Sequence, residues 1–500
     1  MEYFSTRDTA PRLTASEAIS RGLAPDGGLF VPDTLPQIGE AELAALLPLG
    51  YGERAKRILA AYLPEYSDAE LEALVSASYG KNFDTEAIAP VRFTDDKTGY
   101  LELWHGPTSA FKDMALQMLP HLLTASLKKC GEKRGVCILV ATSGDTGKAA
   151  LEGFADVPGT KILVFYPRDG VSDVQRLQMV TQTGENVGVC AVEGNFDDAQ
   201  TGVKRIFGDR ELAEKLSAKG WFLSSANSIN WGRVLPQVVY YISAYCDLLR
   251  DGHIQLGDPV NVCVPTGNFG NILAAYYARD MGVPIQRLIC ASNANNVLTD
   301  FLRTGVYDRN RTFYNTMSPS MDILISSNLE RLLLAITQED SEVRKYMEQL
   351  KETGRYEVSE RVRDKIQKLF MGYCCDDAET QKVIGAVYKK FDYLIDPHTA
   401  VGFSALEQYR KETGDETPAI VASTASPFKF CDNVLSALGV KEQAQGLDIL
   451  DQLSQVTGEP VPAPLAALRD KKPRFHETVE KDHMVDAVLE MLSAPKQDNH

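Results

Sequence analysis

Short runs of consecutive apolar residues recur along the chain from about residue 96, and each run ends in turn-forming residues. Segments with helical spacing separate these runs. Strands that are apolar on both faces and alternate with helices are typical of parallel sheets covered on both sides. The runs form two groups, one before and one after about residue 255, and so predict two open α/β lobes with a cleft between them. The predicted strands are residues 136–142, 161–167, 186–192, 260–266, 287–292, 393–397 and 418–424.

The N-terminal part of the chain has a different pattern. An Asp-Gly-Gly turn at residues 26–28 precedes a short apolar strand at residues 29–31. The stretch that follows has alanine and leucine at helical spacing up to about residue 79. We therefore expect an N-terminal, mostly helical domain that covers the two lobes, the second of which ends in helical segments. The predicted domains are residues 1–95, 96–255 and 256–500.

Length, charge and cysteine usage narrow the class of protein. A chain of 500 residues exceeds what one hydrophobic core usually serves. The net charge of −16 disfavours nucleic acid as a partner, and neither a signal peptide nor a membrane span is apparent. The nine cysteines include one close pair, Cys374-Cys375, and no ligand spacing, so we expect reduced thiols and no metal site. These features predict a cytoplasmic protein, as a monomer or homodimer.

Lys112 is the leading candidate for chemistry. It follows the irregular segment HGPTSAF and opens an amphipathic helix. The positive end of the helix dipole and the apolar neighbours Phe111 and Met114 both favour a neutral amine. An amine with a lowered pKa is what a Schiff base with a carbonyl cofactor requires. Taken alone, the segment also fits a surface lysine on an ordinary helix.

Two turns at predicted strand ends could bind anions, because ligands of open α/β folds bind there. The turn SGDTG, which contains Ser143, Asp145 and Thr146, offers backbone N–H groups and hydroxyls, although helix capping would explain it equally well. The second loop lacks a Walker lysine and the GxGxxG spacing, so a single phosphate suits it better than a nucleotide. A plain tight turn is the alternative for this loop, which consists of Gly267, Asn268, Phe269, Gly270 and Asn271.

Two further segments carry candidate binding groups. NSINWGR places an amide, a hydroxyl and an arginine close together, at Asn227, Ser228 and Arg233, and such a set can hold a second phosphate. Thr424 follows the last predicted strand, where its hydroxyl could face a ring nitrogen. For both segments, capping or backbone bonding is the simpler alternative.

Taken together, these motifs resemble the threonine synthases. HGPTSAFKD, SGDTG, NSINWGR, GNFGN and the late DPHTAVG (residues 396–402) occur jointly in that family, and the N-terminal thirty-odd residues resemble its first domain. The resemblance runs over nearly the whole chain. It implies the tryptophan-synthase-β-like fold of pyridoxal phosphate (PLP) enzymes, fold type II. It also implies a lyase that converts O-phospho-L-homoserine and water into L-threonine and phosphate, the last step of threonine biosynthesis.

By this resemblance Lys112 is the Schiff-base lysine and the base for the α-proton. Thr424 faces the pyridine nitrogen, and because a hydroxyl cannot stabilise a pyridinium as a carboxylate would, the ring nitrogen should stay largely unprotonated. The loop from Gly267 to Asn271 holds the cofactor phosphate. The residues expected at the substrate are Ser143, Asp145, Thr146, Asn227, Ser228 and Arg233.

At one position the residue differs from the one that related enzymes of this fold often carry. Asp145 stands where related enzymes often carry an asparagine that meets the cofactor's phenolic oxygen, and an ionised carboxylate would be repelled there. Either Asp145 turns away or another group, such as Asn268, takes the role. We expect His105 to be structural and His398 to act as a cap or to line the cleft. The competing functions are another fold type II lyase or dehydratase, and a threonine-synthase-like protein that binds PLP without turnover.

Overall fold

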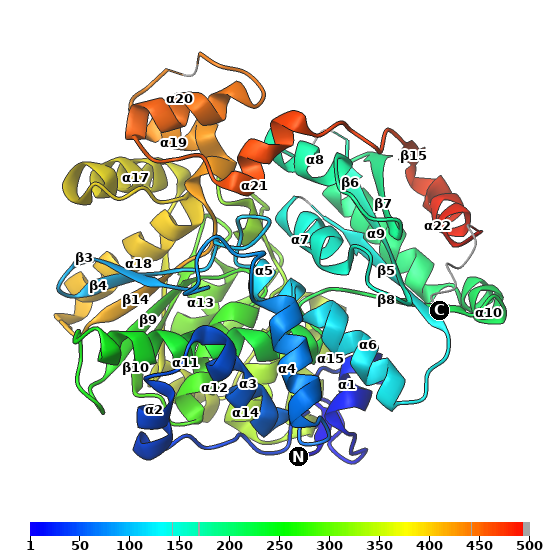
Figure 1. The fold of residues 1–500 in the computed structure, drawn as a ribbon. Helices are drawn as coiled ribbons and strands as arrows, with labels where there is room; N and C mark the ends of the chain where they lie inside the picture. Colours follow the sequence, from blue (N-terminus) through cyan, green and yellow to red (C-terminus); the bar gives the residue numbers. More distant parts are fainter. Residues whose placement is uncertain (143, 169–170, 442, 494–500) are drawn as a thin grey trace.

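Two large sheets form the framework of the molecule (Figure 1). The computed structural model describes residues 1–142, 144–168, 171–441 and 443–493. Within these residues it has one five-stranded sheet, one six-stranded sheet and two small two-stranded sheets. Helices lie on both faces of each large sheet. The predicted α/β class with two lobes, the fold of type II PLP enzymes, is confirmed.

The five-stranded sheet is parallel throughout, with the order β15-β7-β6-β5-β8. Alternate residues of β5 enter different cores: Ile138 packs with helix α7, whereas Leu139 packs with α9 and α22. Burial on both faces explains the continuous apolar run that predicted this strand. The strands are β5 (Gly135–Ala141), β6 (Thr160–Pro167), β7 (Val187–Glu193), β8 (Trp221–Ser224) and β15 (Thr478–Glu480), and the helices are α7 (Asp145–Phe154), α8 (Asp173–Val180), α9 (Phe196–Gly208), α10 (Arg210–Ala218) and α22 (Met484–Ser493).

The six-stranded sheet has the order β13-β10-β9-β14-β4-β3 and is parallel except for the β3–β4 hairpin. Val262 and Val264 of β9 join the core beneath helices α11 and α12, whereas Cys263 joins the core beneath α18. The strands are β3 (Val91–Asp95), β4 (Thr98–Glu102), β9 (Val260–Pro265), β10 (Ile285–Ser292), β13 (Phe370–Cys374) and β14 (Ala419–Ser423), and the main helices are α11 (Trp231–Arg250), α12 (Gly270–Asp280), α17 (Asp377–Phe391) and α18 (Pro397–Thr413).

The N-terminal segment packs against the larger lobe. Arg54 and Asp247 form a buried ion pair of 2.6 Å that joins α3 to α11. The rings of Tyr3, Tyr62 and Tyr277 surround Trp231 at the start of α11. The predicted strand at residues 29–31 is confirmed as β2. The elements of this segment are β1 (Tyr3–Ser5), α1 (Ala15–Arg21), β2 (Phe30–Pro32), α2 (Glu40–Leu46), α3 (Tyr51–Tyr62) and α4 (Asp68–Ser78).

The remaining elements complete the two lobes. Beyond α21 the chain crosses back to the smaller sheet, where β15 pairs with β7 and α22 covers its outer face (Figure 1). The elements around the larger sheet are α13 (Val297–Thr304), β11 (Val306–Asp308), α14 (Leu329–Thr337), α15 (Asp340–Thr353), β12 (Arg355–Glu357), α16 (Glu360–Gln367), α19 (Cys431–Ala437), α20 (Asp448–Thr457) and α21 (Ala463–Ala466).

Two local predictions were wrong. The apolar segment at residues 393–397 is no strand, because its first three side chains are buried in a loop and Asp396 then caps α18 by accepting from the N–H groups of His398 and Thr399. The single helix expected after Lys112 is divided into α5 (Asp113–Leu116) and α6 (Leu119–Lys129). Pro120 in the first turn of α6 has no N–H to extend the preceding turn.

The other expected strands are confirmed within one or two residues at each end. All nine cysteines are free thiols, including the adjacent Cys374 and Cys375. Across the described ranges, no helix is both long and apolar enough to cross a membrane.

Candidate active site

Lys112 is held where the segment before α5 meets the end of β14. Both the N–H and the hydroxyl of Thr108 donate to the carboxylate of Asp113, at 2.8 and 2.6 Å, and fix the turn before the helix. The N–H of Phe111 donates to the carbonyl of Thr424 at 2.8 Å. Lys112 itself is buried, and its Nζ donates to Ser320 Oγ at 3.0 Å. The lysine is therefore fixed by parts of the chain that are far apart in sequence.

The environment of Lys112 lowers its pKa to about 8. Burial is the main cause, and Asp145, which opposes it, is outweighed by burial together with the positive charges of Lys429 and Arg233. The sequence correctly predicted that the pKa of Lys112 is lowered. The contribution of a helix dipole is small, however, because α5 has only four residues.

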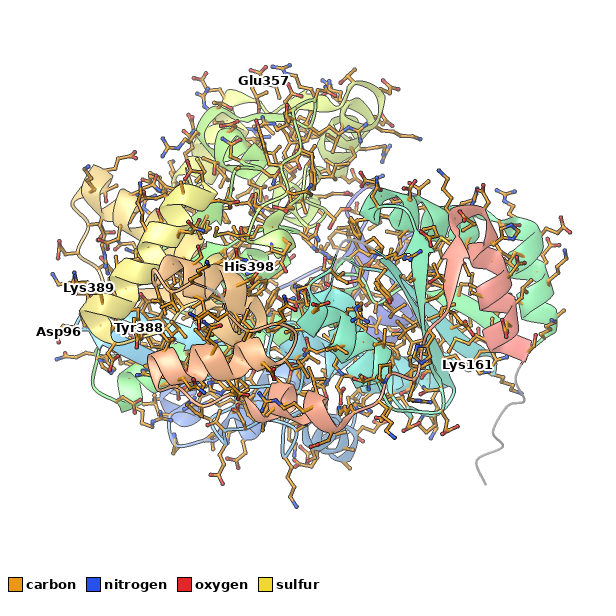
Figure 2. All side chains as sticks on the ribbon, turned by 90° about the horizontal axis from the view of Figure 1, so that it is seen from above. Asp96, Lys161, Glu357, Tyr388, Lys389 and His398 are labelled. Carbon is orange, nitrogen blue, oxygen red and sulfur yellow. The ribbon has the colours of Figure 1, made fainter. Side chains whose placement is uncertain are left out.

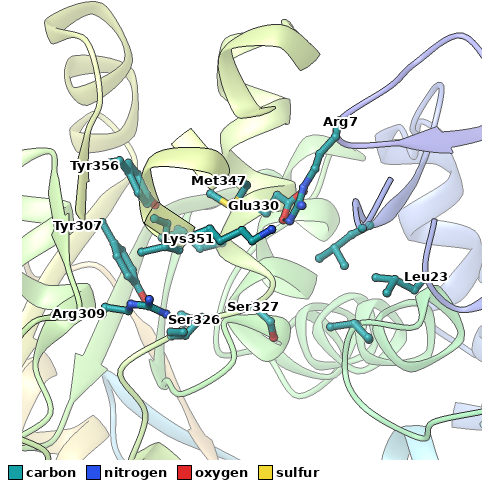
Figure 3. Close-up of a pocket in the computed structure, with 16 residues that line it drawn as sticks. Arg7, Leu23, Tyr307, Arg309, Ser326, Ser327, Glu330, Met347, Lys351 and Tyr356 are labelled. Atoms are coloured by element: carbon teal, nitrogen blue, oxygen red, sulfur yellow. Dashed lines mark hydrogen bonds and ion pairs between the residues drawn. The ribbon is translucent and has the colours of Figure 1, made fainter. Parts of the chain in front are cut away.

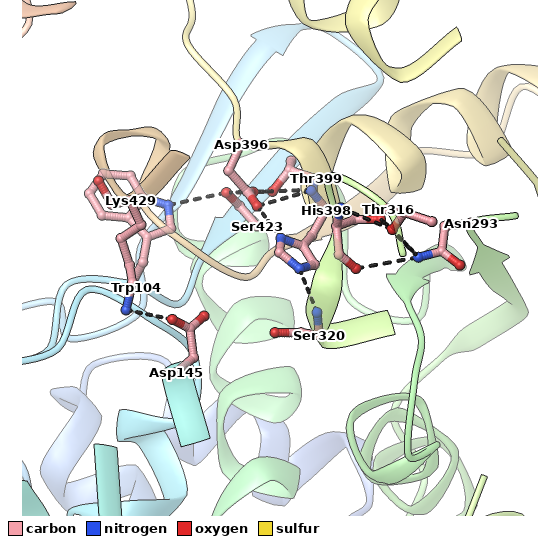
Figure 4. A network of polar contacts seen from close by, with 12 residues as sticks. Trp104, Asp145, Asn293, Thr316, Ser320, Asp396, His398, Thr399, Ser423 and Lys429 are labelled. Atoms are coloured by element: carbon pink, nitrogen blue, oxygen red, sulfur yellow. Dashed lines mark hydrogen bonds and ion pairs between the residues drawn. The ribbon is translucent and has the colours of Figure 1, made fainter. Parts of the chain in front are cut away.

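Asp145 is neutralised by a lysine that the sequence reasoning missed. Lys429 Nζ lies 2.7 Å from Asp145 Oδ1, and both side chains are almost fully buried. Gln175 Nε2 also donates to Asp145 at 2.9 Å, and Lys429 donates to the carbonyl of Thr108 at 2.9 Å. Although burial alone would raise the pKa of Asp145, Lys429 and Lys112 hold it well below its usual range. The aspartate is thus ionised, with a cation beside it (Figure 4).

In the sequence, Lys429 is marked only by its place in the segment PFKF (Pro427–Phe430). In the structure this segment is a short turn after β14, and all of its side chains are buried. Lysine is almost never fully buried unless it is paired.

The loop between β9 and α12 has the features of a phosphate site. Phe269 has a left-handed backbone with φ of 54°, and a Cβ at Gly267 would come within 2.6 Å of the Ser320 carbonyl oxygen. The carbonyl oxygens of Gly267 and Asn268 accept from Ser326 Oγ and from the N–H of Asn328. The first N–H groups of α12 have no intrahelical acceptor. The backbone donors of this turn are therefore suited to an anion.

Asn271 and Arg233 carry donors without partners. Asn271 Oδ1 accepts from the hydroxyls of Tyr240 and Tyr241, whereas its Nδ2 has no partner in the described part of the chain. The Nε of Arg233 is likewise unpartnered, and no carboxylate among the described residues pairs with this buried guanidinium. Burial lowers the pKa of Arg233 to about 10. An unpaired buried cation is costly, so this position favours an anionic ligand.

Ser228, in the segment NSINWGR, lies against the loop between β9 and α12. Asn328 Nδ2 donates to Ser228 Oγ at 3.3 Å, and Ser228 Cβ lies 3.9 Å from the place of a Cβ at Gly270. Asn227 is exposed, and its N–H donates to Ser225 Oγ. Asn230 is the residue that caps α11. Ser228 thus lies beside the loop, whereas Asn227 is exposed.

The turn SGDTG is only partly described. Ser143 lies outside the described residues, and Thr146 is half-buried in the first turn of α7. The hydroxyl of Thr142 accepts from the N–H groups of Gly144 and Gly147 at 3.0 and 2.9 Å. Thr142 therefore fixes this turn, and capping does not account for Thr146.

The comparisons with known proteins agree over the whole chain. Residues 101–424 match the family model of pyridoxal-phosphate dependent enzymes, and residues 2–79 and 399–489 match the N-terminal and C-terminal models of threonine synthase. Threonine synthase from Saccharomyces cerevisiae is 36% identical over 99% of this chain and 98% of its own length. The chain belongs to the threonine synthase family. Its cofactor is pyridoxal phosphate.

Other members of the threonine synthase family are similarly related. The enzyme from Pseudomonas aeruginosa is 40% identical over 87% of this chain and 90% of its own length. The crystal structure of PLP-bound threonine synthase from Brucella melitensis has 38% identity and a TM-score of 0.88, with 99% of this chain and 100% of that chain covered. Threonine synthase-like 1 from Homo sapiens is 43% identical over 85% of this chain, which covers only 58% of that longer protein.

The two histidines that the sequence left open both make structural contacts. His105 lies between Asp84 and Glu102, at 2.5 and 2.9 Å. Burial alone would lower its pKa, but the two carboxylates raise it to about 9. His398 is buried, with Nδ1 2.7 Å from Asp396 Oδ2. Its Nε2 accepts from the N–H of Ser320 at 3.2 Å, so it reaches the partner of Lys112.

A separate cavity of about 380 Å³ lies near the N-terminal segment (Figure 3). The partly buried ion pair between Arg7 and Glu330 forms part of its wall, and Tyr307 and Tyr356 lie stacked at one side. None of the predicted site residues that the structure describes lines it. Ser326, which donates to the carbonyl of Gly267, does line it, so the cavity borders the loop between β9 and α12.

Proposed function

We propose that this chain is a threonine synthase, which converts O-phospho-L-homoserine and water into L-threonine and inorganic phosphate. The observation that carries the proposal is Arg233, a buried guanidinium without an acidic partner in the described residues, close enough to Lys112 to lower the pKa of its amine. A site of this kind combines an amine of low pKa with a place for a phosphate beyond that of the cofactor.

The residues present fit PLP. We assign Lys112 as the Schiff-base lysine, because its amine is buried and its pKa is about 8. The cofactor phosphate is assigned to the loop at Gly267, Asn268, Phe269, Gly270 and Asn271, where Asn271 Nδ2 lacks a partner. Thr424 offers a neutral hydroxyl for the pyridine nitrogen. When bound, PLP supplies an electron-accepting ring that stabilises negative charge on the substrate's carbon atoms.

The protein's own part in the reaction is to hold groups and to move protons. Lys112 Nζ takes the proton from the α-carbon of the substrate, since an amine with a pKa near 8 can exchange protons at neutral pH. Arg233 and Ser228, together with the exposed Asn227, hold the leaving phosphate while its bond to the γ-carbon breaks and a proton is lost from the β-carbon. The γ-carbon then takes up a proton and becomes the methyl group, water adds its hydroxyl to the β-carbon, and a proton returns to the α-carbon.

The turn with Ser143, Asp145 and Thr146 is assigned to the amino-acid end of the substrate. Lys429 cancels the charge of Asp145, so that this carboxylate does not repel the cofactor's phenolic oxygen. The further assignments are three domains, over residues 1–95, 96–255 and 256–500, and a cytoplasmic enzyme that acts as a monomer or homodimer. The chain crosses between the two lobes, because β4 and α11 pack with the larger sheet, whereas β15 and α22 return to the smaller one (Figure 2).

One observation favours a second candidate. Relatives at 41–44% identity bear the name threonine synthase-like 1, and this chain covers 58–61% of their length. A protein of that kind could release phosphate without forming threonine, or could bind PLP and substrate without turnover. Arg233, which is buried and has no acidic partner among the described residues, and the lowered pKa of Lys112 favour turnover of a phosphorylated substrate.

Replacing Arg233 by methionine tests the proposed phosphate pocket. The variant removes the charge and keeps most of the side-chain volume. We expect kcat/KM for O-phosphohomoserine to fall about a hundredfold, or about 3 kcal/mol, because the phosphate loses a buried charged donor. Arg233→Lys should recover part of the loss, since it restores the charge without the planar fork.

The control is the binding of an amino acid without phosphate, such as L-homoserine, followed through the visible absorption of bound PLP. Its affinity should be unchanged in Arg233→Met. An equal loss of affinity for both ligands would show that Arg233 binds a group they share, and would remove the main support for a phosphorylated substrate.

A further inference from the structure

Ser320 is the side chain that meets the amine of Lys112. It lies in the short turn Pro319–Met321, which is 208 residues further along the chain. Its Oγ accepts from Lys112 Nζ at 3.0 Å, the one hydrogen bond of that amine within the described residues. Ser320 belongs to the polar segment SPSMDILISSN (residues 318–328), whose composition fits either the border of an active site or an ordinary loop. Its place beside Lys112 is set by the fold.

The turn that carries Ser320 is held rigidly from two sides. On one side the N–H of Ser320 donates to His398 Nε2 at 3.2 Å. On the other, the Ser320 carbonyl oxygen lies so close to Gly267 that a Cβ there would approach it to 2.6 Å. The turn is thus fixed between α18 and the loop assigned to the cofactor phosphate.

His398 is in turn oriented by Asp396. Its Nδ1 lies 2.7 Å from Asp396 Oδ2, and both side chains are buried (Figure 4). Because Nε2 accepts from a backbone N–H, the ring hydrogen is on Nδ1 and points to the carboxylate. Asp396 also accepts from the N–H groups of His398 and Thr399 at 3.0 and 3.1 Å, so it cannot rotate away. A continuous set of hydrogen bonds therefore runs from Asp396 through His398 and Ser320 to Lys112.

The charged groups around Lys112 are engaged with other residues or carry a positive charge themselves, so a neutral side chain is left as the hydrogen-bond partner of its amine. Asp145 is paired with Lys429, Asp113 is bonded to Thr108, and Arg233 is a cation. None of these groups can both accept a hydrogen bond from the ammonium form and donate one to the neutral amine, because an ionised carboxylate only accepts and a guanidinium only donates. A hydroxyl can, because it accepts a hydrogen bond from an ammonium group and donates one to a neutral amine.

We propose that Ser320 is a positioning residue for Lys112, which holds the amine in place whenever it is not bonded to the cofactor, and that Asp396 and His398 fix Ser320 for this purpose. A base that leaves the cofactor, takes up a proton and returns must stay within reach of the reacting atoms throughout. The inference rests on the proposed role of Lys112 as Schiff-base lysine and base.

The test measures how fast the cofactor bonds to lysine. PLP is added to the chain after its own cofactor has been removed, and the rate is followed by visible absorption between about pH 6 and pH 10. Only the neutral amine attacks the carbonyl, so the pH profile reports the pKa of Lys112, expected at about 8. In Ser320→Ala the ammonium form loses its acceptor. We expect the apparent pKa to fall by about one unit and the plateau rate to fall roughly tenfold.

Matched variants separate positioning from simple structural support. Ser320→Thr keeps the hydroxyl and should behave like the native chain. His398→Gln can keep an acceptor near the place of Nε2 and should also be close to native, whereas His398→Asn reaches only as far as Nδ1 and should resemble Ser320→Ala. Because His398 acts through Ser320, adding His398→Asn to Ser320→Ala should cause no further change.

Two results would overturn the proposal. One is an unchanged pH profile and rate in Ser320→Ala, a variant that removes a single oxygen from a half-buried side chain and should fold normally. The other is an undiminished effect of His398→Asn in the Ser320→Ala background. The measurement does not involve threonine formation, so a failure of this inference is distinguishable from a failure of the proposed overall reaction. A native chain whose bond to PLP does not form at Lys112 would instead refute the assignment of that lysine.

Discussion

Turnover of O-phosphohomoserine should fall by a factor of about 10³ or more when Lys112 is replaced by alanine. The variant loses both the amine that bonds to PLP and the base that takes the α-proton. It should also lose the visible absorption band of lysine-bound PLP. Both changes can be measured on one preparation, by steady-state kinetics and by absorption with stoichiometric cofactor.

Lys128→Ala is the matched control. Lys128 is exposed on α6, 16 residues beyond Lys112, and it should tolerate substitution with unchanged absorption and kinetics. Retention of the absorption band in Lys112→Ala would mean that another lysine bonds the cofactor. Retention of activity without the band would refute Lys112 as the base.

The second large effect concerns the buried pair between Lys429 and Asp145. Replacing Lys429 by methionine leaves the carboxylate of Asp145 ionised and uncompensated in the interior, and leaves the Thr108 carbonyl without its donor. Breaking a buried pair in this way costs about 3–5 kcal/mol of the free energy of unfolding. Denaturant unfolding at neutral pH measures the loss.

The pH dependence of this loss has a definite sign. In the native chain the pKa of Asp145 is held below its unfolded value of 3.8, so its contribution to stability is present above that value and is lost only in strong acid. In Lys429→Met the nearest cation is lost, so that burial is opposed only by Lys112 and by the hydrogen bond from Gln175, and the folded pKa of Asp145 rises. The variant should therefore be relatively more stable in mild acid than at neutral pH, the reverse of the native contribution.

A double variant supplies the control for this prediction. Lys429→Met combined with Asp145→Asn removes both charges and should recover much of the lost stability, because no unpaired charge remains. If Lys429→Met alone unfolds no more easily than the native chain, then the pair is not needed to neutralise Asp145.

The parts of the fold that the sequence predicted share one physical cause. Strands such as β5 and β9 are buried on both faces, so their apolar runs are continuous and their ends are marked by turns. The binding turns follow such strands directly, which places Asp145 and Gly267 at the carboxyl ends of the two sheets. The segment at residues 393–397 has the same composition but lies in a buried loop, because a cap at Asp396 starts α18 there. Composition alone does not separate these two cases.

The parts that could not be predicted depend on contacts between distant residues. Lys429 looks like an ordinary lysine in PFKF, and only the fold brings it to Asp145. Ser320 meets Lys112 across 208 residues of chain. The pKa of Lys112 was predicted to be lowered, but its main cause, burial, comes from tertiary packing rather than from the four-residue helix α5.

The most direct test of the proposed function is to measure L-threonine and inorganic phosphate in the same sample during incubation of the PLP-loaded protein with O-phospho-L-homoserine. We expect both products to appear together and in equal amounts, and both to require native Lys112. Phosphate without threonine would contradict the proposed function and would favour another lyase of this fold. The absence of both products, with PLP visibly bound, would indicate a threonine-synthase-like protein without this activity.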